Sequence, residues 1–283
     1  AANNWPLSAG DGLKTVYVRY ADTAGNWSDP QAPGASDEII LDTAGVTGSI
    51  LVNGGNAYAN SENITLMLTY SDGSGAGCPL MEFSNNGLDW SGGGACNSPS
   101  AWTLTNPSAD GARSVSVRYK DAAGNQTIYS DDIILDKTPA STGSIVIQNG
   151  VDTTTTASVT LALSCSDALS GCSEMKFNGG GGWSEPAPFA TTAAYTLLTS
   201  NGTNTVIALF SDIAGNWTTA TISDSIIHDN TIATGSLTIA GGSQYAIATS
   251  VTLTVSASDA NGVTNMKFSN DGSTWSSPAS YAT

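Results

Sequence analysis

The stretch Val16-Tyr-Val-Arg-Tyr-Ala-Asp-Thr-Ala-Gly-Asn26 recurs as Val115-Ser-Val-Arg-Tyr-Lys-Asp-Ala-Ala-Gly-Asn125 and as Val206-Ile-Ala-Leu-Phe-Ser-Asp-Ile-Ala-Gly-Asn216. In each copy alternate residues are apolar up to the aromatic one, which is typical of a β-strand with one buried face. The Gly-Asn pair after the acid predicts a tight turn, since both residues tolerate positive φ. A pattern repeated every ~94 residues predicts an array of similar domains.

The rest of the repeat also consists of strand patterns. We call the apolar part of the repeated stretch the anchor strand. A closing strand, Asp37-Glu-Ile-Ile-Leu-Asp42, follows the first anchor strand and has counterparts at 131–136 and 224–229. Each new domain opens with a short apolar run, continues into a clean alternating strand and then reaches a Met-Xaa-Phe segment. These elements occupy 50–52, 64–70 and 81–83, then 145–147, 159–165 and 175–177, then 237–239, 251–257 and 266–268. About seven short strands per repeat predict an all-β immunoglobulin-like sandwich.

The repeat boundaries predict two complete domains and two halves. The complete domains are residues 44–137 and 138–230, while 1–43 holds only closing strands and 231–283 only opening ones. Because neither half can bury its apolar face alone, we expect 231–283 of one unit and 1–43 of the next to form one domain. The units are either windows on one long chain or subunits joined head to tail by strand complementation. With no initiator Met and no signal peptide, we expect a mature fragment or an internal segment.

Charge and hydropathy exclude several partners. The chain has 24 acidic and 8 basic residues and a net charge of −16. Nucleic acid and anionic membranes need cationic patches, so we expect neither as a partner, whereas divalent cations are natural ones. No stretch approaches the roughly 18 consecutive apolar residues of a membrane span.

The four cysteines occur as two pairs, Cys78 with Cys96 and Cys165 with Cys172. Each pair lies within one repeat and has no neighbouring His, so disulfides are expected rather than metal sites. Disulfides place the protein outside a reducing cytosol, at the cell surface or in the extracellular space.

Groups that could perform catalysis are scarce. The single histidine, His228, stands where the other copies have Leu41 and Leu135, so we expect a solvated or partly packed strand residue. A Ser-His-Asp arrangement has no consistent place, and the frequent aspartates recur in every repeat rather than forming one cleft. The sequence therefore predicts a protein that is not an enzyme.

The chain resembles the tandem immunoglobulin-like repeats of large bacterial surface proteins and adhesins. The resemblance rests on Met266-Lys-Phe-Ser-Asn-Asp-Gly-Ser-Thr-Trp275, on the Asp-Xaa-Ala-Gly-Asn turn and on the Ile-Ile-Leu-Asp linker. It covers the whole chain and implies an extracellular structural or adhesive module, often with calcium between domains. The uniformity of the copies favours a filament or adhesin stalk over the alternative, a glycan- or receptor-binding module.

The recurring aspartates are the strongest chemical signal. The loops after the second strand and before the last strand of such a sandwich lie at the end that receives the preceding chain. We therefore expect Asp42, Asp72 and Asp121 to converge at one linker, and Asp136, Asp167 and Asp212 at the next. Corresponding positions near the chain ends are Asp22, Asp229 and Asp259. Converging carboxylates suit calcium, which takes 6–8 oxygen ligands; the alternative is that each aspartate caps its own turn.

Two further sets of residues have side chains suited to binding or modification. Trp90, Trp183 and Trp275 occur once per repeat, and we expect packing over the sandwich edge rather than stacking on a glycan. Sequons for N-glycosylation are present at Asn26, Asn63, Asn125, Asn201 and Asn216.

Overall fold

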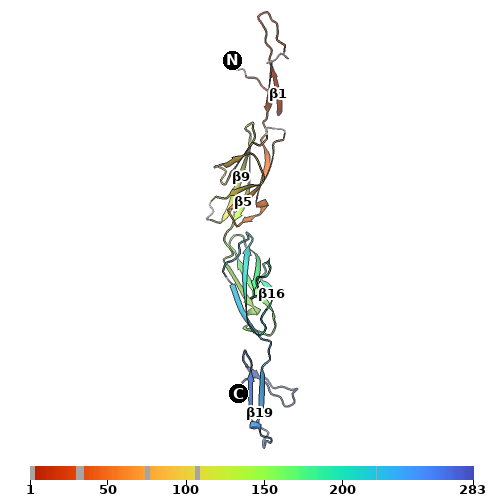
Figure 1. The fold of residues 1–283 in the computed structure, drawn as a ribbon, viewed down its shortest axis with the longest axis vertical. Coiled ribbons are helices and arrows are strands. Elements are labelled where there is room, and N and C mark those ends of the chain that lie inside the picture. Colours follow the sequence, from red (N-terminus) through yellow and green to blue (C-terminus); the bar gives the residue numbers. More distant parts are fainter. Residues whose placement is uncertain (1–3, 30–34, 74–76, 106–108, 221) are drawn as a thin grey trace. The chain divides into compact units, whose positions relative to one another are not determined.

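The computed structural model describes residues 4–29, 35–73, 77–105, 109–220 and 222–283 (Figure 1). The chain divides into two compact units. The first comprises residues 1–140 together with the loops 167–172 and 211–217, and the second comprises 141–166, 173–210 and 218–283. Among the described residues, no helix has the length and apolar character needed to cross a lipid bilayer.

The first complete sandwich has one sheet of three strands and one of five. The first sheet has the order β3-β5-β8, with β3 at Thr47–Val52, β5 at Asn63–Ser71 and β8 at Ser100–Thr103. The second has the order β4-β10-β9-β6-β7, with β4 at Tyr58–Ala59, β10 at Gln126–Leu135, β9 at Gly111–Lys120, β6 at Leu80–Ser84 and β7 at Ser91–Gly94. The anchor strand β9 and the closing strand β10 form an antiparallel hairpin, as the sequence predicted.

The second sandwich repeats this order. Its first sheet is β11-β13-β16, with β11 at Thr142–Ile147, β13 at Ser158–Ser166 and β16 at Thr192–Thr196. Its second sheet is β12-β18-β17-β14-β15, with β12 at Thr153–Thr154, β18 at Ile222–His228, β17 at Gly202–Asp212, β14 at Cys172–Asn178 and β15 at Ala187–Pro188. Single turns of 3-10 helix follow the opening strands, at Asn53–Gly55 (η1), Gln148–Gly150 (η2) and Ala240–Gly242 (η3).

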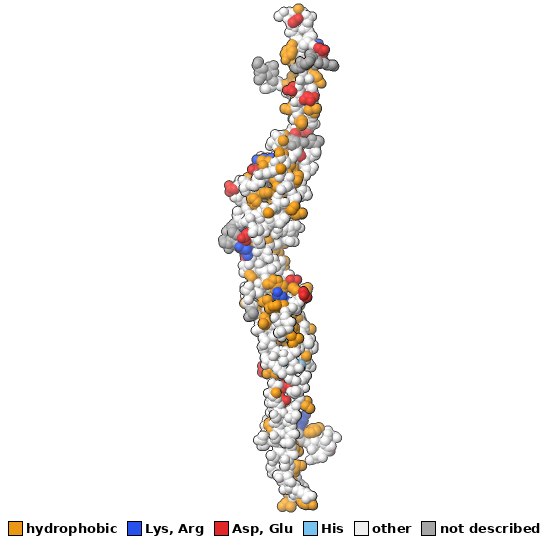
Figure 2. All heavy atoms as spheres, in the orientation of Figure 1, with side chains coloured by type: hydrophobic (Ala, Val, Ile, Leu, Met, Phe, Trp, Pro, Cys, Tyr) orange, Lys and Arg blue, Asp and Glu red, His pale blue; other side chains and the backbone are white. Residues whose placement is uncertain are grey.

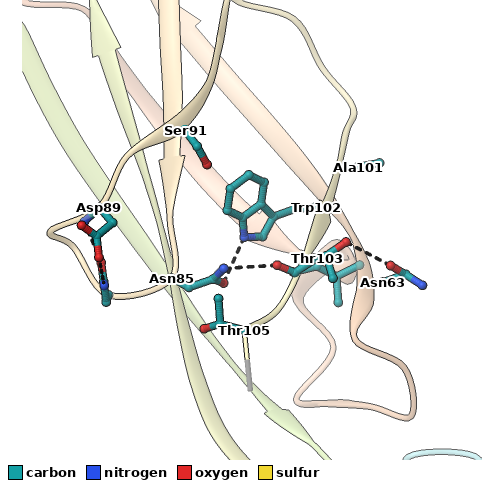
Figure 3. Close-up of a pocket in the computed structure, with 10 residues that line it drawn as sticks. Asn63, Asn85, Asp89, Ser91, Ala101, Trp102, Thr103 and Thr105 are labelled. Atoms are coloured by element: carbon teal, nitrogen blue, oxygen red, sulfur yellow. Dashed lines mark hydrogen bonds between the residues drawn. The ribbon is translucent and has the colours of Figure 1, made fainter. Parts of the chain in front are cut away.

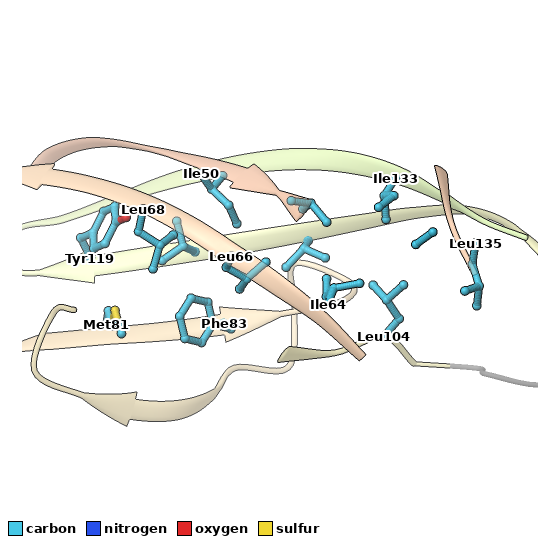
Figure 4. Packing of buried hydrophobic residues seen from close by; sticks show 14 of the residues in the cluster. Ile50, Ile64, Leu66, Leu68, Met81, Phe83, Leu104, Tyr119, Ile133 and Leu135 are labelled. Carbon is cyan, nitrogen blue, oxygen red and sulfur yellow. The ribbon is translucent and has the colours of Figure 1, made fainter. Parts of the chain in front are cut away.

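The core of the first sandwich lies between its two sheets (Figure 4). Leu66 of β5 and Val115, Val117 and Tyr119 of β9 are fully buried, because alternate side chains of a strand point to the same face. The equivalent residues of β17, Val206, Ala208 and Phe210, are likewise fully buried in the second sandwich. The alternation read from the sequence therefore identifies the buried faces of both complete domains.

The two chain ends contain shorter sheets. Near the N-terminus β1 (Gly12–Tyr17) pairs with β2 (Ser36–Leu41). Near the C-terminus β19 (Thr234–Ile239) pairs with β20 (Leu253–Ser258), and β21 (Asn265–Met266) pairs with β22 (Ala279–Ser280). That these ends are two halves of one domain stays a prediction.

All four cysteines are in disulfide bonds. Cys78 and Cys96 are bonded to each other, as predicted, with their Cα atoms 5.7 Å apart. The bond joins the segment just before β6 to the segment just after β7, and these two strands pair at Met81 with Gly94 and at Phe83 with Ser91. It therefore holds an edge strand that has few ladder hydrogen bonds of its own.

Candidate metal centres

Two groups of three aspartates converge as the repeat positions predicted. In the first group, Asp42, Asp72 and Asp121, one carboxylate oxygen of each residue lies within 4.8 Å of the others. Asp42 follows β2 directly and begins the linker, Asp72 follows β5, and Asp121 follows β9. Three segments distant in sequence thus meet at one end of the first sandwich.

The second group repeats this arrangement at the next linker. Asp136, Asp167 and Asp212 also offer carboxylate oxygens within 4.8 Å of one another. Asp136 and Asp167 follow β10 and β13, Asp212 is the last residue of β17, and all three belong to the first compact unit. Asp136 and Asp212 are each only 1% exposed.

Several of these carboxylate oxygens have no hydrogen-bond partner among the described residues. Both oxygens of Asp72 and Oδ2 of Asp136 are buried and unpartnered. Burying an ion without compensation is costly, and two like charges 4 Å apart repel by about 4 kcal/mol at an effective dielectric constant of about 20. A bound cation would offset both costs, which turn capping alone does not.

The other carboxylate oxygens stiffen their own loops. Oδ1 of Asp167 accepts the backbone N–H groups of Leu169, Ser170 and Gly171 at 2.9, 2.8 and 2.9 Å. Burial opposes ionisation of Asp167, but these N–H donors outweigh it and hold its pKa below the ordinary value. Asp167 is therefore a turn cap as well as a charged member of the group, and its role as a calcium ligand stays a prediction.

The asparagine of the repeated turn has a different role from the one expected. The Gly-Asn pair predicted a tight turn because both residues tolerate positive φ, but only the glycines adopt it, at 91° for Gly25, 97° for Gly124 and 96° for Gly215. The side chains of Asn125 and Asn216 instead form a pair of hydrogen bonds each, which we call the asparagine latch. Nδ2 of Asn216 donates to Oδ2 of Asp212 at 2.7 Å and to the carbonyl of Asp136 at 2.8 Å.

The same latch is present at the first linker. Nδ2 of Asn125 donates to Oδ2 of Asp121 at 2.9 Å and to the carbonyl of Asp42 at 3.1 Å. This asparagine latch ties the linker backbone to the loop that carries the third aspartate.

Each linker is also held from the side of the preceding sheet. Oδ1 of Asp11 accepts the N–H of Thr43 at 3.1 Å, and Oδ1 of Asp110 accepts the N–H of Lys137 at 3.0 Å. The hydroxyl of Thr138 donates to Asp110 and, together with the Lys137 N–H, keeps the pKa of that carboxyl below its ordinary value. A pocket of about 290 Å³ beside the first group is lined by Asp11, Asp42 and Asp72 among others.

Within the part of the chain that the structure describes, the other predicted metal residues belong to no such group. Asp22 is exposed and accepts hydrogen bonds from Asn26, which keep its pKa low. Asp229 accepts hydrogen bonds from Thr231, and Oδ1 of Asp259 accepts the N–H of Asn261 at 2.8 Å. Asp22 and Asp259 thus cap local turns, whereas Asp229 also accepts a side-chain hydrogen bond from Asn261 in the loop after Asp259, which helps to keep the pKa of Asp229 below its ordinary value.

The latch bears on the predicted glycosylation sites. The amide nitrogens of Asn125 and Asn216, which would carry the glycan, are the latch donors. Asn26 donates from the same atom to Asp22. Asn63 and Asn201 are exposed and donate no hydrogen bond from the amide nitrogen to any described residue. A glycan at Asn125 or Asn216 would replace one donor hydrogen of the latch, and glycosylation of all five asparagines stays a prediction.

The remaining candidates are structural. His228 is 4% exposed, more buried than expected, and Nδ1 lies 3.2 Å from the carbonyl of Thr199. Cζ of Arg118 lies 4.4 Å from the ring centroid of Trp90, and Nζ of Lys176 lies 5.4 Å from the ring centroid of Trp183. Trp90 is partly buried at the sheet surface, whereas Trp183 and Trp275 are 44% and 57% exposed.

A polar pocket that the sequence did not predict lies beside Trp102 (Figure 3). It has a volume of about 660 Å³ and is lined by Asn63, Ile64, Asn85, Asn86, Asp89, Ser91, Ala101, Trp102, Thr103 and Thr105. Nε1 of Trp102 donates to Oδ1 of Asn85 at 3.0 Å, which orients the ring. In the second sandwich glycine replaces this asparagine, and a Cβ at Gly179 would lie 2.2 Å from the hydroxyl oxygen of Tyr195.

The fold and the two linkers define tandem immunoglobulin-like β-sandwiches. No protein-family description and no curated protein matches the chain. Among solved structures, the fibronectin(III)-like modules of Clostridium thermocellum CbhA are 12% identical with a TM-score of 0.41, over 64% of this chain and 95% of that one.

Two adhesin structures are also similar. A tetra-tandem repeat from the extending region of a large adhesion protein is 20% identical with a TM-score of 0.29, over 95% of this chain and 70% of that one. A Ca²⁺-stabilised adhesin that helps an Antarctic bacterium to reach out and bind ice is 19% identical with a TM-score of 0.41, over 81% of this chain and 59% of that one.

Proposed function

We propose that this chain is a non-enzymatic structural segment of an extracellular surface protein, in which immunoglobulin-like sandwiches follow one another as a filament or adhesin stalk. The observation that supports this best is the recurrence of one aspartate group at two successive linkers. A device repeated at each joint serves the joints, whereas a catalytic site occurs once. The disulfides and the net charge of −16 suit an oxidising, solvent-exposed setting.

Calcium is the cation that fits the two groups. All side-chain donors of the groups are carboxylate oxygens, which suit a hard cation, and the cysteines nearby are committed to disulfides. Asp42, Asp72 and Asp121 would hold one ion, and Asp136, Asp167 and Asp212 the other. Each ion would cross-link a linker to two loops of the following sandwich. The asparagine latch prepares the site, so that binding costs little reorganisation.

Calcium is expected to raise the melting temperature of the chain, and Asp167→Asn is expected to remove most of that increase. A cation at 100 times its dissociation constant stabilises the folded state by about 2.7 kcal/mol. For a domain of 60–100 residues this corresponds to roughly 10–20 °C. Differential scanning calorimetry in EDTA and in 0–10 mM CaCl₂ measures the shift, with Asp132→Asn, an exposed acid outside both groups, as the matched control.

The variant distinguishes a cation ligand from a turn cap. Asparagine keeps an Oδ1 acceptor for the three N–H donors of the 168–171 turn but removes the charge. In EDTA the Asp167→Asn chain should melt at or above the wild-type temperature, because repulsion within the group is relieved. An EDTA-insensitive wild type together with a less stable Asp167→Asn chain would show that the aspartates are turn caps only.

A glycan-binding role is the second candidate, and the pocket beside Trp102 favours it. The pocket combines an aromatic ring with amide, hydroxyl and carboxylate groups, which together suit the apolar faces and hydroxyls of a saccharide. Its counterpart in the second sandwich has glycine and the Tyr195 hydroxyl in place of the Asn85 amide. One domain of the array thus differs from its neighbour at a binding-competent surface.

Binding of the wild-type chain to immobilised oligosaccharides tests this candidate. Asp89→Ala and Asn63→Ala alter the exposed rim of the pocket without touching the core, so each should weaken binding about tenfold or more if it loses a hydrogen bond to a charged or amide group. Trp183→Ala, on the other sandwich, is the control. Retention of binding by both rim variants, or no binding by the wild type, would exclude the pocket.

A further inference from the structure

A second pocket adjoins the pocket beside Trp102, at the same edge of the first sandwich. It has a volume of about 380 Å³, and its lining includes Phe83 of β6 together with Gly92 and Gly94 of β7. Ala101 and Trp102 of β8 line both pockets. Because β7 and β8 are the outermost strands of their two sheets, the pockets form two neighbouring subsites along the open edge. We call the larger pocket the first subsite and this one the second subsite.

The Trp102 ring borders both subsites and is fixed in place. Figure 3 shows the ring between the segments that carry Ser91 and Ala101. In addition to its hydrogen bond to Asn85, the ring packs against Phe83, with the two ring centroids 5.3 Å apart. A ring that is already held in one orientation loses little entropy when a ligand packs against it. The two subsites therefore share one preorganised apolar surface.

The backbone of Ala101 offers a donor and an acceptor at the junction of the subsites. The N–H of Leu104 donates to the carbonyl of Glu62 at 2.9 Å, which makes these two residues a hydrogen-bonded pair of the antiparallel β5–β8 ladder. Such pairs alternate along the ladder, so the N–H and C=O groups of Ala101 point away from β5. Ala101 is exposed. Its two backbone groups can therefore bond to a ligand that crosses from one subsite to the other.

Glycines of β7 keep the second subsite open. A Cβ at Gly92 would lie 3.4 Å from Cδ2 of Phe83 and 3.7 Å from Cζ3 of Trp102, so a side chain there would fill the space beside the ring. In the second sandwich the corresponding edge strand β15 ends at a proline, and Phe189 follows it. The Phe189 ring packs edge-on against Phe210 in the core, with the centroids 5.7 Å apart. The two sandwiches thus differ in how this edge is built.

The charge at the subsites disfavours acidic ligands. Asp89 lines the first subsite, and among the described residues neither lining includes a lysine, an arginine or a histidine. The chain carries a net charge of −16, and Lys and Arg side chains form only small, separate groups on the face in Figure 2. An anionic ligand would be repelled by Asp89 and would find no cation in either lining to pair with.

The free edge of β8 is poorly suited to a peptide strand. Strand addition uses main-chain hydrogen bonds to a row of N–H and C=O groups along the edge. Pro99 has no N–H, and the carbonyl of Thr103 already accepts Nδ2 of Asn85 at 3.1 Å. What remains is an aromatic ring with separate donors and acceptors, which suits the apolar faces and hydroxyls of sugars.

We propose that the two subsites together bind one linear, uncharged saccharide, with consecutive sugar units on either side of Trp102. The N–H and C=O groups of Ala101 bond to sugar hydroxyls at the junction, and Asp89 accepts a hydroxyl in the first subsite. The inference rests on the glycan-binding role proposed for the first pocket, and it specifies the ligand class and the extent of that site.

Isothermal titration calorimetry of the 283-residue chain tests the number of subsites and the charge preference. The probes are neutral cello-, malto- and manno-oligosaccharides of one to four sugar units, with oligogalacturonates of equal length as the acidic comparators. In the neutral series that binds, the affinity should rise about tenfold or more from one unit to four. The oligogalacturonate of four units should bind at least about tenfold more weakly than the neutral tetrasaccharide.

Gly94→Leu tests the second subsite separately. Gly92 and Gly94 line this subsite and Gly93 does not, as expected for alternate residues of a strand. A Cβ at Gly94 would meet no atom within 4 Å, so the leucine side chain should occupy the subsite without disturbing the fold. It should reduce the affinity for the tetrasaccharide to that for the monosaccharide and leave the latter unchanged. Gly93→Ala is the control, because its Cβ would approach only the flexible side chains of Leu80 and Glu82.

The possible failures are distinguishable. Equal affinities for one and four units, with no effect of Gly94→Leu, would overturn the second subsite and leave the first pocket as a glycan site. Equal binding of the oligogalacturonate would overturn the uncharged ligand class. Tighter binding of a hexapeptide of alternating Thr and Val than of any saccharide would assign the edge to a peptide strand instead. Binding of no saccharide would overturn the inference and the glycan-binding role together, without affecting the calcium-dependent melting predicted for the linkers.

Discussion

Tyr119→Ala is expected to destabilise the first sandwich by about 3–5 kcal/mol, the range measured for removal of a large aromatic side chain from a core. Tyr119 is fully buried, its ring centroid lies 6.0 Å from that of Tyr70, and its hydroxyl donates to the carbonyl of Ser49 at 3.2 Å. Because small domains are stable by only about 5–15 kcal/mol, this loss removes much of the total. Chemical denaturation followed by near-ultraviolet circular dichroism measures it.

The sequence itself provides the control for this variant. Tyr20 occupies the same position in the first repeat but is 65% exposed. Tyr20→Ala should change the unfolding free energy of either complete sandwich by less than about 0.5 kcal/mol, as is usual for exposed positions. Equal losses from the two substitutions would mean that the sandwich boundaries described above are wrong.

Removal of the Cys78–Cys96 disulfide is expected to have the next largest effect. The bond spans 18 residues of sequence, and closing a loop of about this length stabilises a protein by about 3 kcal/mol in the loop-entropy estimate. A Cys78→Ala/Cys96→Ala chain should therefore exchange the amides of β6 and β7 faster. Hydrogen-exchange mass spectrometry resolves this by peptide, and the second sandwich in the same molecule is the internal control. Unchanged exchange of β6 and β7 would contradict the prediction.

The repeat predicted most of the fold, because alternation and recurrence are properties of the sequence alone. Strand pairing, buried faces and the convergence of Asp42, Asp72 and Asp121 follow from knowing which loops of a sandwich share an end. Cation binding does not follow from that convergence. It depends on which oxygens stay unpartnered, such as Oδ2 of Asp136, and no spacing in the sequence reports this.

The features that sequence reasoning missed all depend on side-chain direction. The latch of Asn216 was interpreted as a backbone preference, although its recurrence beside Asp212 was a usable signal. The hydrogen bond from the Val52 N–H to Oδ2 of Asp131 was also missed, because the sequence shows only that an acidic residue recurs at this position. The pocket beside Trp102 had no signal, because its wall forms when Asn85 of one sheet meets an aromatic residue of the other.

The parallel pairing of β4 with β10 determines how a sandwich would respond to a pulling force. Tension enters ahead of β3 and leaves after β10, so it slides these two short parallel segments along each other. The N–H groups of Ile134 and Asp136 donate to the carbonyls of Ala57 and Ala59 at 3.0 and 2.8 Å, and the load would fall on both bonds at once. Bonds loaded together in shear resist far more force than bonds opened one by one. The second sandwich repeats this clamp, with Asp229 donating to Thr154 at 2.9 Å.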